Sequence, residues 1–133
     1  MRIAAKSGVD VRLITPYHGD HALVHLISRS YYKELAEAGV RIYEYLPGFI
    51  HSKNFVCDDL VCSVGTTNLD YRSLYLHYEC GALCFKTDAV LQVKTDFLDT
   101  LSRCKELLPD KIQKPPAIQR LLISALRLFE PML

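Results

Sequence analysis

Two short runs of sequence decide how this chain folds and what it can do: His51-Ser52-Lys53-Asn54-Phe55-Val56-Cys57-Asp58 and Gly65-Thr66-Thr67-Asn68. Together they have the spacing H-x-K-x4-D-x6-G-T-x-N. Residues 51–57 and 60–64 are rich in apolar and β-branched residues, which predicts two strands joined by a tight turn at Asp58-Asp59. Because side chains alternate along a strand, we expect His51 and Lys53 to point to the same face.

This combination of side chains suits attack on a phosphodiester. An imidazole such as that of His51 forms a covalent phosphorus intermediate or transfers a proton. The ammonium group of Lys53, the hydroxyl of Thr66 and the amide of Asn68 are groups that bind phosphoryl oxygens as charge develops on them. The sequence therefore predicts a phosphate site at this hairpin.

The spacing resembles the HKD motif of the phospholipase D superfamily. Three segments of the chain are similar to the C-terminal half of bacterial cardiolipin synthases, and the similarity runs from Gly8 to about Leu133. These segments are Val64-Gly65-Thr66-Thr67-Asn68-Leu69-Asp70-Tyr71-Arg72-Ser73 with Glu79, Ser28-Arg29-Ser30-Tyr31-Tyr32, and Gly39-Val40-Arg41-Ile42-Tyr43-Glu44-Tyr45.

The resemblance implies an α/β fold, a phospholipase D-like domain with a mixed β-sheet flanked by helices and a single HKD half. The motif residues His51, Lys53 and Asp58 form the candidate catalytic set. In the family, two histidines share the site, and His51 would be the general acid and base. We expect Asp58, at a turn, to anchor the hairpin by accepting backbone N–H bonds.

The other site residues follow from the family and from their chemistry. Lys53, Thr66 and Asn68 correspond to the family's phosphate-binding groups, and Thr66 stands where many members have serine. Glu79 is expected to accept a hydrogen bond from His51 and to stabilise its imidazolium form. Neither a metal nor a cofactor is expected.

Hydrophobic periodicity and turn residues predict the order of elements. They divide the chain into a catalytic half-domain at 1–110, a linker at 111–117 and an amphipathic helix at 118–133. The last helix either packs on its own domain or lies at a membrane interface. The predicted elements are a helix end at 1–7, strands at 9–14, 41–46, 51–57, 60–64 and 77–85, and helices at 20–38, 88–108 and 118–129.

Composition narrows the function further. The net charge of +1 on 133 residues gives no basic field for nucleic acid, so a nucleic-acid partner is not expected. The chain has five cysteines, an odd number without disulfide-framework spacing. Four of them could form a zinc site, but their spacing fits a zinc knuckle poorly and favours buried apolar roles: Cys57, Cys62, Cys80 and Cys84.

Three hypotheses remain because the chain carries one motif where the family mechanism needs two. It is the C-terminal half of a cardiolipin synthase-like phosphatidyltransferase, or a homodimeric single-motif phosphodiesterase or nuclease, or a non-catalytic remnant of the fold. The phosphatidyltransferase hypothesis is favoured by the segments that resemble cardiolipin synthases and by the intact motif. The abrupt start in a helix leads us to expect a piece of a longer chain. Its partners would be phosphatidylglycerol or a related phospholipid, a membrane surface and a second HKD half. We expect a peripheral location at the cytoplasmic face of the cell membrane.

Overall fold

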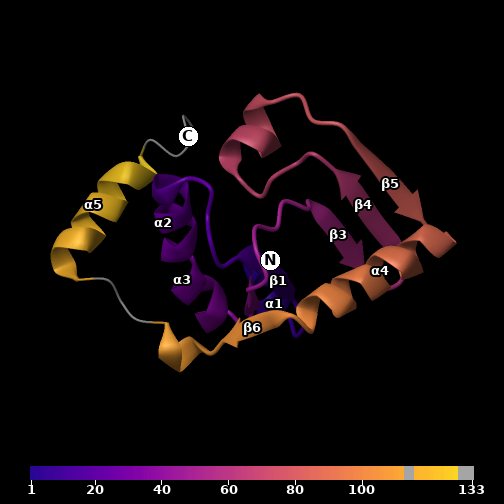
Figure 1. Ribbon diagram of the computed structural model, residues 1–133, viewed down its shortest axis with the longest axis horizontal. Coiled ribbons are helices and arrows are strands. Elements are labelled where there is room, and N and C mark those ends of the chain that lie inside the picture. The colour runs from indigo at the N-terminus through magenta and orange to yellow at the C-terminus, as the bar shows by residue number, and fades with distance from the viewer. Residues whose placement is uncertain (113–115, 129–133) are drawn as a thin grey trace. The chain divides into compact units, whose positions relative to one another are not determined.

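The structure, a computed structural model, describes residues 1–112 and 116–128, and the chain divides into two compact units (Figure 1). The first, called here the scaffold unit, comprises residues 1–50 and the described residues from 103 onward. The second, the hairpin unit, comprises residues 51–102. Each unit has its own three-stranded sheet.

The sheet of the scaffold unit is mixed, with the order β1-β2-β6. β1 runs parallel to β2, and β6 runs antiparallel to it. The central strand is the most buried, since Ile42 on β2 has no exposed surface. The strands are β1 (Arg12–Pro16), β2 (Arg41–Tyr45) and β6 (Cys104–Leu107).

Two helices make the crossover that a parallel strand pair requires. α2 (Ala22–Ser30) and α3 (Tyr32–Glu37) replace the single helix predicted over 20–38, because the chain turns at Tyr31. The predicted C-cap is confirmed at Gly39, whose φ of 96° is a left-handed conformation. One core cluster joins α3 to the sheet through Tyr32, Ala36, Val40 and Ile42.

Among the described residues of the scaffold unit, one charged side chain is buried. Glu44 on β2 is 1% exposed, and it pairs with Arg29 of α2 at 3.0 Å. A buried carboxylate without a cationic partner would be strongly destabilising. The ion pair thus joins two of the segments that resemble cardiolipin synthases, residues 28–32 and residues 39–45.

The helix predicted over 88–108 is too long. α4 (Asp88–Leu101) ends before a turn, and the following residues form β6. β6 gains a ladder with β2, reinforced by the ion pair of Arg41 and Glu106 at 2.9 Å. Tertiary pairing has overridden the helical spacing of Cys104 and Leu108.

The C-terminal helix α5 (Ala117–Arg127) contacts α2. Ile123 is buried, and the Arg127 guanidinium donates to Ser30 Oγ at 2.8 Å. One of the two predicted roles, packing on its own unit, is therefore present. Residues 129–133 of the predicted helix lie outside the described residues.

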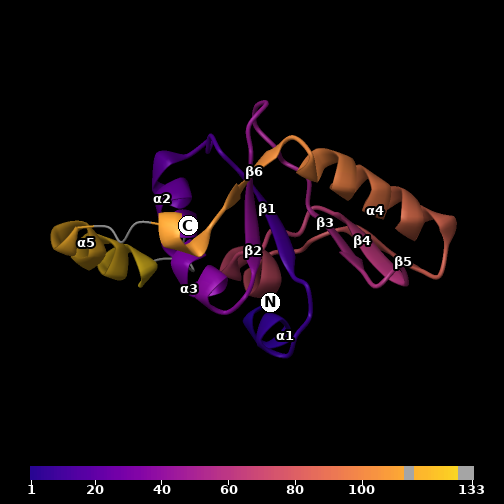
Figure 2. The ribbon, with the colours of Figure 1, turned by 90° about the horizontal axis from the view of Figure 1, so that it is seen from below.

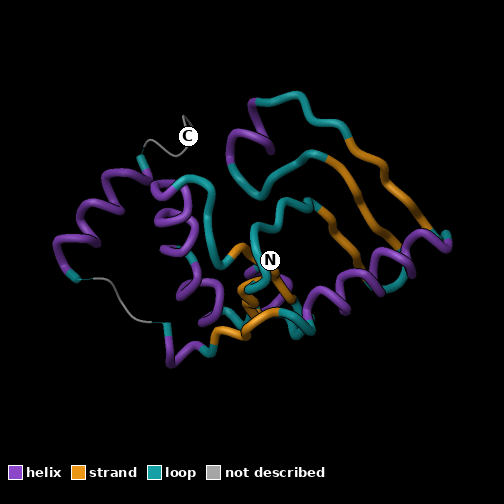
Figure 3. The backbone as a smooth tube through the Cα atoms, viewed as in Figure 1, coloured by secondary structure: helices purple, strands orange, loops and turns teal. Residues whose placement is uncertain are grey.

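The hairpin unit holds an antiparallel sheet of order β3-β4-β5, with α4 contacting all three strands (Figure 2). A long connection between β4 and β5 contains a π-helical turn at Arg72–Leu76 (Figure 3). The strands are β3 (Asn54–Cys57), β4 (Val61–Gly65) and β5 (Gly81–Phe85).

The α/β class and the mixed sheet flanked by helices are as predicted, but the strands divide between two sheets. The predicted tight turn is confirmed, because Asp58 and Asp59 have φ values of 50° and 56°. Leu60 N donates to Cys57 O at 3.0 Å to close it. Pairs of left-handed residues suit the twist of a hairpin.

Candidate active site

Three strand ends meet at one end of the β3-β4-β5 sheet. β3 begins at Asn54, which is paired with Val64, and Gly65 is paired with Gly81, the first residue of β5. In an antiparallel sheet, the segments before β3, after β4 and before β5 therefore leave the sheet together. We call this the site end. It is flanked by His51, Lys53, Thr66, Asn68 and Glu79.

Gly65 allows the strands to approach closely at the site end. A Cβ atom on Gly65 would lie 2.6 Å from the carbonyl oxygen of Cys80 and 2.7 Å from the Cα of Gly81. Any side chain at position 65 would thus displace backbone. The close approach lets Thr66 N donate to Cys80 O at 3.0 Å, which extends the ladder beyond the strands.

His51 and Lys53 lie immediately before β3, so the strand predicted over 51–57 begins later than expected. Alternation along a strand therefore does not place these two side chains. Instead, Lys53 Nζ donates to the backbone carbonyl of His51 at 2.8 Å. His51 is exposed and Lys53 half-buried, so the imidazole is accessible from solvent.

Thr66 and Glu79 are joined across the site end. The Thr66 hydroxyl donates to the Glu79 carboxylate and accepts from Cys80 N at 3.1 Å. Because a hydroxyl has one hydrogen, a phosphate oxygen would compete with Glu79 for it. The sequence did not predict this bond, and a contact of Glu79 with His51 stays a prediction.

The long connection between β4 and β5 is organised around Ser73, which is 7% exposed. Ser73 N donates to Asp70 Oδ1 at 2.6 Å, and Asn68 Nδ2 donates to Ser73 Oγ at 3.4 Å. Asn68 is thus held by a neighbour within its own loop. Ser73 belongs to a segment that resembles the family, but no role was predicted for it. Irregular segments have no periodicity that marks a buried polar residue.

Glu79 is held ionised by its surroundings. Hydrogen bonding by the hydroxyls of Thr66 and Ser73 lowers the pKa of the Glu79 carboxyl group, and the nearby ammonium group of Lys53 acts in the same direction. His77 in turn accepts a hydrogen bond from Arg72 Nε at 2.7 Å. Cationic and neutral donors thus surround one carboxylate beside the predicted phosphate groups.

A family model described as "Cardiolipin synthase, PLD-like domain" matches residues 1–101, about three quarters of the chain. The chain belongs to this family. The predicted resemblance is thereby confirmed, with the HKD spacing inside the matched region.

Individual relatives match over all 133 residues. The chain is 39% identical to an uncharacterized protein of Streptococcus mutans and covers 29% of it. It is 41% identical to a cardiolipin synthase of Geobacillus sp. (strain WCH70) and to cardiolipin synthase 2 of Bacillus anthracis, covering 26% of each. The chain therefore spans about a quarter of the length of these relatives.

In this PLD-like domain, Asp58 lies apart from the other motif residues. It occupies the turn at the far end of β3, separated from the site end by a strand that rises roughly 3.3 Å per residue. Its carboxylate accepts a bond from the Cys57 thiol at 3.3 Å, which raises the pKa of that thiol. The expected backbone N–H partners are replaced by a thiol.

The cysteines of the PLD-like domain do not gather around a metal position. Cys62 and Cys84 are cross-strand partners, and burial raises the pKa of the Cys62 thiol. Over residues 1–112 and 116–128, no group of at least three histidine, cysteine, aspartate or glutamate side chains is placed to hold a metal ion.

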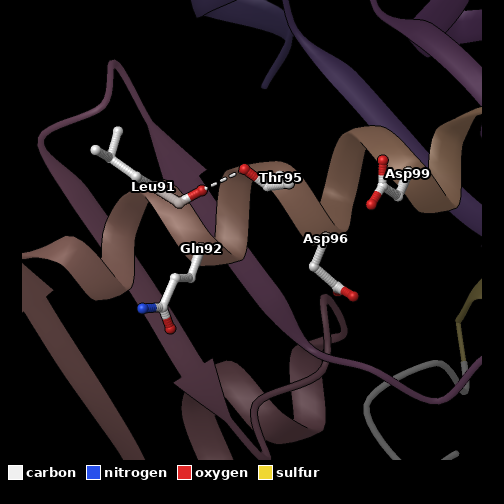
Figure 4. A pocket seen from close by; sticks show the side chains of 5 residues that line it. All are labelled: Leu91, Gln92, Thr95, Asp96 and Asp99. Carbon is white, nitrogen blue, oxygen red and sulfur yellow. Dashed lines mark hydrogen bonds between the residues drawn. The ribbon is translucent and has the colours of Figure 1, made fainter.

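A shallow depression on α4 is a poor place for a phosphate. It is lined by exposed side chains that include two carboxylates, and Thr95 Oγ1 donates to Leu91 O at 2.9 Å (Figure 4). None of the predicted site residues lines it. The lining residues are Leu91, Gln92, Thr95, Asp96 and Asp99.

A helix that crosses a bilayer needs about 20 mostly apolar residues. Within the part of the chain that the structure describes, no helix is both long and apolar enough to span a membrane.

Proposed function

We propose that this chain supplies the C-terminal, single-motif half of a cardiolipin synthase-like phosphatidyltransferase. The observation that carries the proposal is that the segments before β3, after β4 and before β5 leave the sheet at one end in a chain of this family. These segments contain the predicted site residues His51, Lys53, Thr66, Asn68 and Glu79. The names of the Geobacillus and Bacillus relatives support the choice of reaction.

In the proposed reaction, two phosphatidylglycerol molecules become cardiolipin and glycerol. A histidine of a second HKD half attacks the phosphorus of the first lipid, forming an N–P bond. The P–O bond to glycerol breaks, and its electron pair goes to the glycerol oxygen, which takes a proton from His51. His51 then accepts the hydroxyl proton of the second phosphatidylglycerol, whose oxygen attacks phosphorus and releases the first histidine.

The other residues act on charge and geometry. Lys53 and Asn68 hold the phosphoryl oxygens as negative charge develops on them. Glu79, ionised at neutral pH, opposes the positive charge that appears on the imidazole of His51. Asp58 keeps the hairpin turn in shape and does not reach the phosphate.

The proposed enzyme acts at a lipid surface. Its substrate is a bilayer component, so the site end must meet phospholipid headgroups, and we propose the cytoplasmic face of the cell membrane. The second HKD half comes either from a longer chain or from a second copy.

A chimera provides the direct test. This chain replaces the matching quarter of the Geobacillus cardiolipin synthase, and cardiolipin formed from phosphatidylglycerol vesicles is measured by mass spectrometry. We expect cardiolipin and an equal amount of glycerol from the chimera, and neither from its His51→Ala form.

The isolated chain is measured in parallel on the same vesicles. Activity of the isolated chain that disappears with His51→Ala would mean that two copies assemble a complete site. A folded chimera that makes no cardiolipin, beside an active parent enzyme, would contradict the proposed function.

A further inference from the structure

A single serine connects the predicted phosphate-binding amide to the carboxylate of the site. Ser73 is 7% exposed and is the one buried polar side chain of the hairpin unit within its described residues. A buried hydroxyl is costly unless it is hydrogen-bonded. The partners of Ser73 therefore indicate why it is there.

Those partners are all side chains of the long connection or its end. Ser73 Oγ accepts from Asn68 Nδ2 at 3.4 Å, and the Ser73 hydroxyl lies near enough to the Glu79 carboxyl group to lower the pKa of that group. The Ser73 amide is fixed from behind, since it donates to Asp70 Oδ1 at 2.6 Å. The π-helical turn that carries Ser73 is closed by His77 N donating to Arg72 O at 2.8 Å.

The direction of these bonds is determined by elementary chemistry. An ionised carboxylate only accepts, so the single hydrogen of the Ser73 hydroxyl goes to Glu79. Ser73 Oγ is then left as an acceptor, and it must face the amide nitrogen of Asn68, not its carbonyl oxygen. One N–H of Asn68 is used by Ser73, and the second is left for another acceptor.

We infer that Ser73 is a positioning residue that fixes the Asn68 amide so that it offers an N–H, and not Oδ1, to an oxygen of the substrate phosphodiester. A reversed amide would turn a carbonyl oxygen toward the phosphate and repel it. Ser73 does not touch substrate, and it acts through Asn68 with Glu79 as the anchor. The inference rests on the proposed function only in naming the phosphodiester as substrate.

Binding of inorganic phosphate to the full chain tests the inference without any turnover. Phosphate is titrated while the ³¹P resonance is followed for the wild type, Ser73→Ala and Ser73→Thr. Loss of one orienting hydrogen bond should weaken binding by about fivefold in Ser73→Ala. Ser73→Thr keeps a hydroxyl and should restore affinity to within about twofold of the wild type.

A matched control and a second loss variant accompany this titration. Ser102→Ala removes an exposed serine of the same unit, whose hydroxyl bonds to Asp99 O, and should leave phosphate binding unchanged. Ser73→Cys nearly keeps the side-chain volume, but a thiol is a weak hydrogen-bond donor. If Ser73→Ala does not fold, the phosphate affinity of Ser73→Cys is measured in its place and should also be weaker than that of the wild type.

The carboxylate supplies an independent readout. The ¹³C resonance of the Glu79 carboxyl group is titrated in selectively labelled protein, and its pKa should rise toward the ordinary value in Ser73→Ala and Ser73→Cys but not in Ser102→Ala. A merely structural role for Ser73 would leave both this pKa and the phosphate affinity unchanged in a folded variant.

Unchanged phosphate binding and an unchanged Glu79 titration in a folded Ser73→Ala or Ser73→Cys variant overturn the inference. Weaker phosphate binding with rescue by Ser73→Thr supports it, even if the chimera forms no cardiolipin. In that case the proposed reaction fails while the positioning of Asn68 stands.

Discussion

The two sheets of this protein are held in different ways. The scaffold unit is organised around buried apolar residues, with Ile42 fully buried at the centre of its sheet. The hairpin unit buries few side chains, and its site end is organised by hydrogen bonds between Thr66 and Glu79 and between Asn68 and Ser73. Most of the buried apolar residues lie in the scaffold unit, and the predicted phosphate-binding residues lie in the hairpin unit. Four substitutions test that separation.

The largest expected effect is on activity and not on stability. In the active chimera, His51→Ala should lower cardiolipin formation by about 10²–10⁴-fold, because it removes the proton-transfer group. Since His51 is exposed, thermal unfolding should be almost unchanged. His18→Ala in the scaffold unit is the control, and equal activity loss in both variants would contradict the assignment.

The next effect is on stability. Ile42→Ala opens a cavity in the scaffold unit and should lower the free energy of unfolding by about 2–5 kcal/mol. Urea unfolding followed by circular dichroism measures it. Ile3→Ala, at a side chain that is 84% exposed, should change the same quantity by less than about 0.5 kcal/mol. A similar loss of unfolding free energy in both variants would contradict the prediction that Ile42 stabilises the scaffold unit through its burial.

A smaller effect tests the close approach of the strands at the site end. Gly65→Ala places a Cβ against the backbone of Cys80 and Gly81, which should cost about 1–3 kcal/mol of unfolding free energy and weaken phosphate binding. Gly48→Ala meets no atom within 4 Å and should be neutral in both measurements. A neutral Gly65→Ala would mean that the strands separate freely there.

The smallest effect is a pH dependence. The pKa of Glu79 is lowered in the folded chain, so its ionised form stabilises the fold above the unfolded pKa of about 4.3. That contribution is lost as pH falls through the folded pKa. The difference in unfolding free energy between the wild type and Glu79→Gln should therefore shrink from pH 7 to pH 3. Asp96→Asn on α4 is the control, and a constant difference for Glu79→Gln would contradict the prediction.

The sequence was most informative where local chemistry and tertiary structure agree. The motif spacing was sufficient to predict the hairpin and its turn at Asp58-Asp59. The C-cap at Gly39 followed from the need for a left-handed residue. These features depend on neighbours close in the chain.

The features that were missed depend on distant partners. Residues 104–107 have helical spacing, yet pairing with β2 makes them a strand. The bond between Thr66 and Glu79 arises only when Gly65 lets β5 approach. Ser73 is buried by a loop that has no period of its own. Sequence pattern alone specifies none of these contacts.

The turn at Asp58-Asp59 has a practical consequence. Surface turns tolerate inserted residues better than the strands that they connect. A short lanthanide-binding tag between these two aspartates would sit a strand's length from His51, in chain that the proposed chemistry does not use. Luminescence from such a tag could then report when two halves meet or when the chain reaches a vesicle, without altering the groups that handle the phosphate.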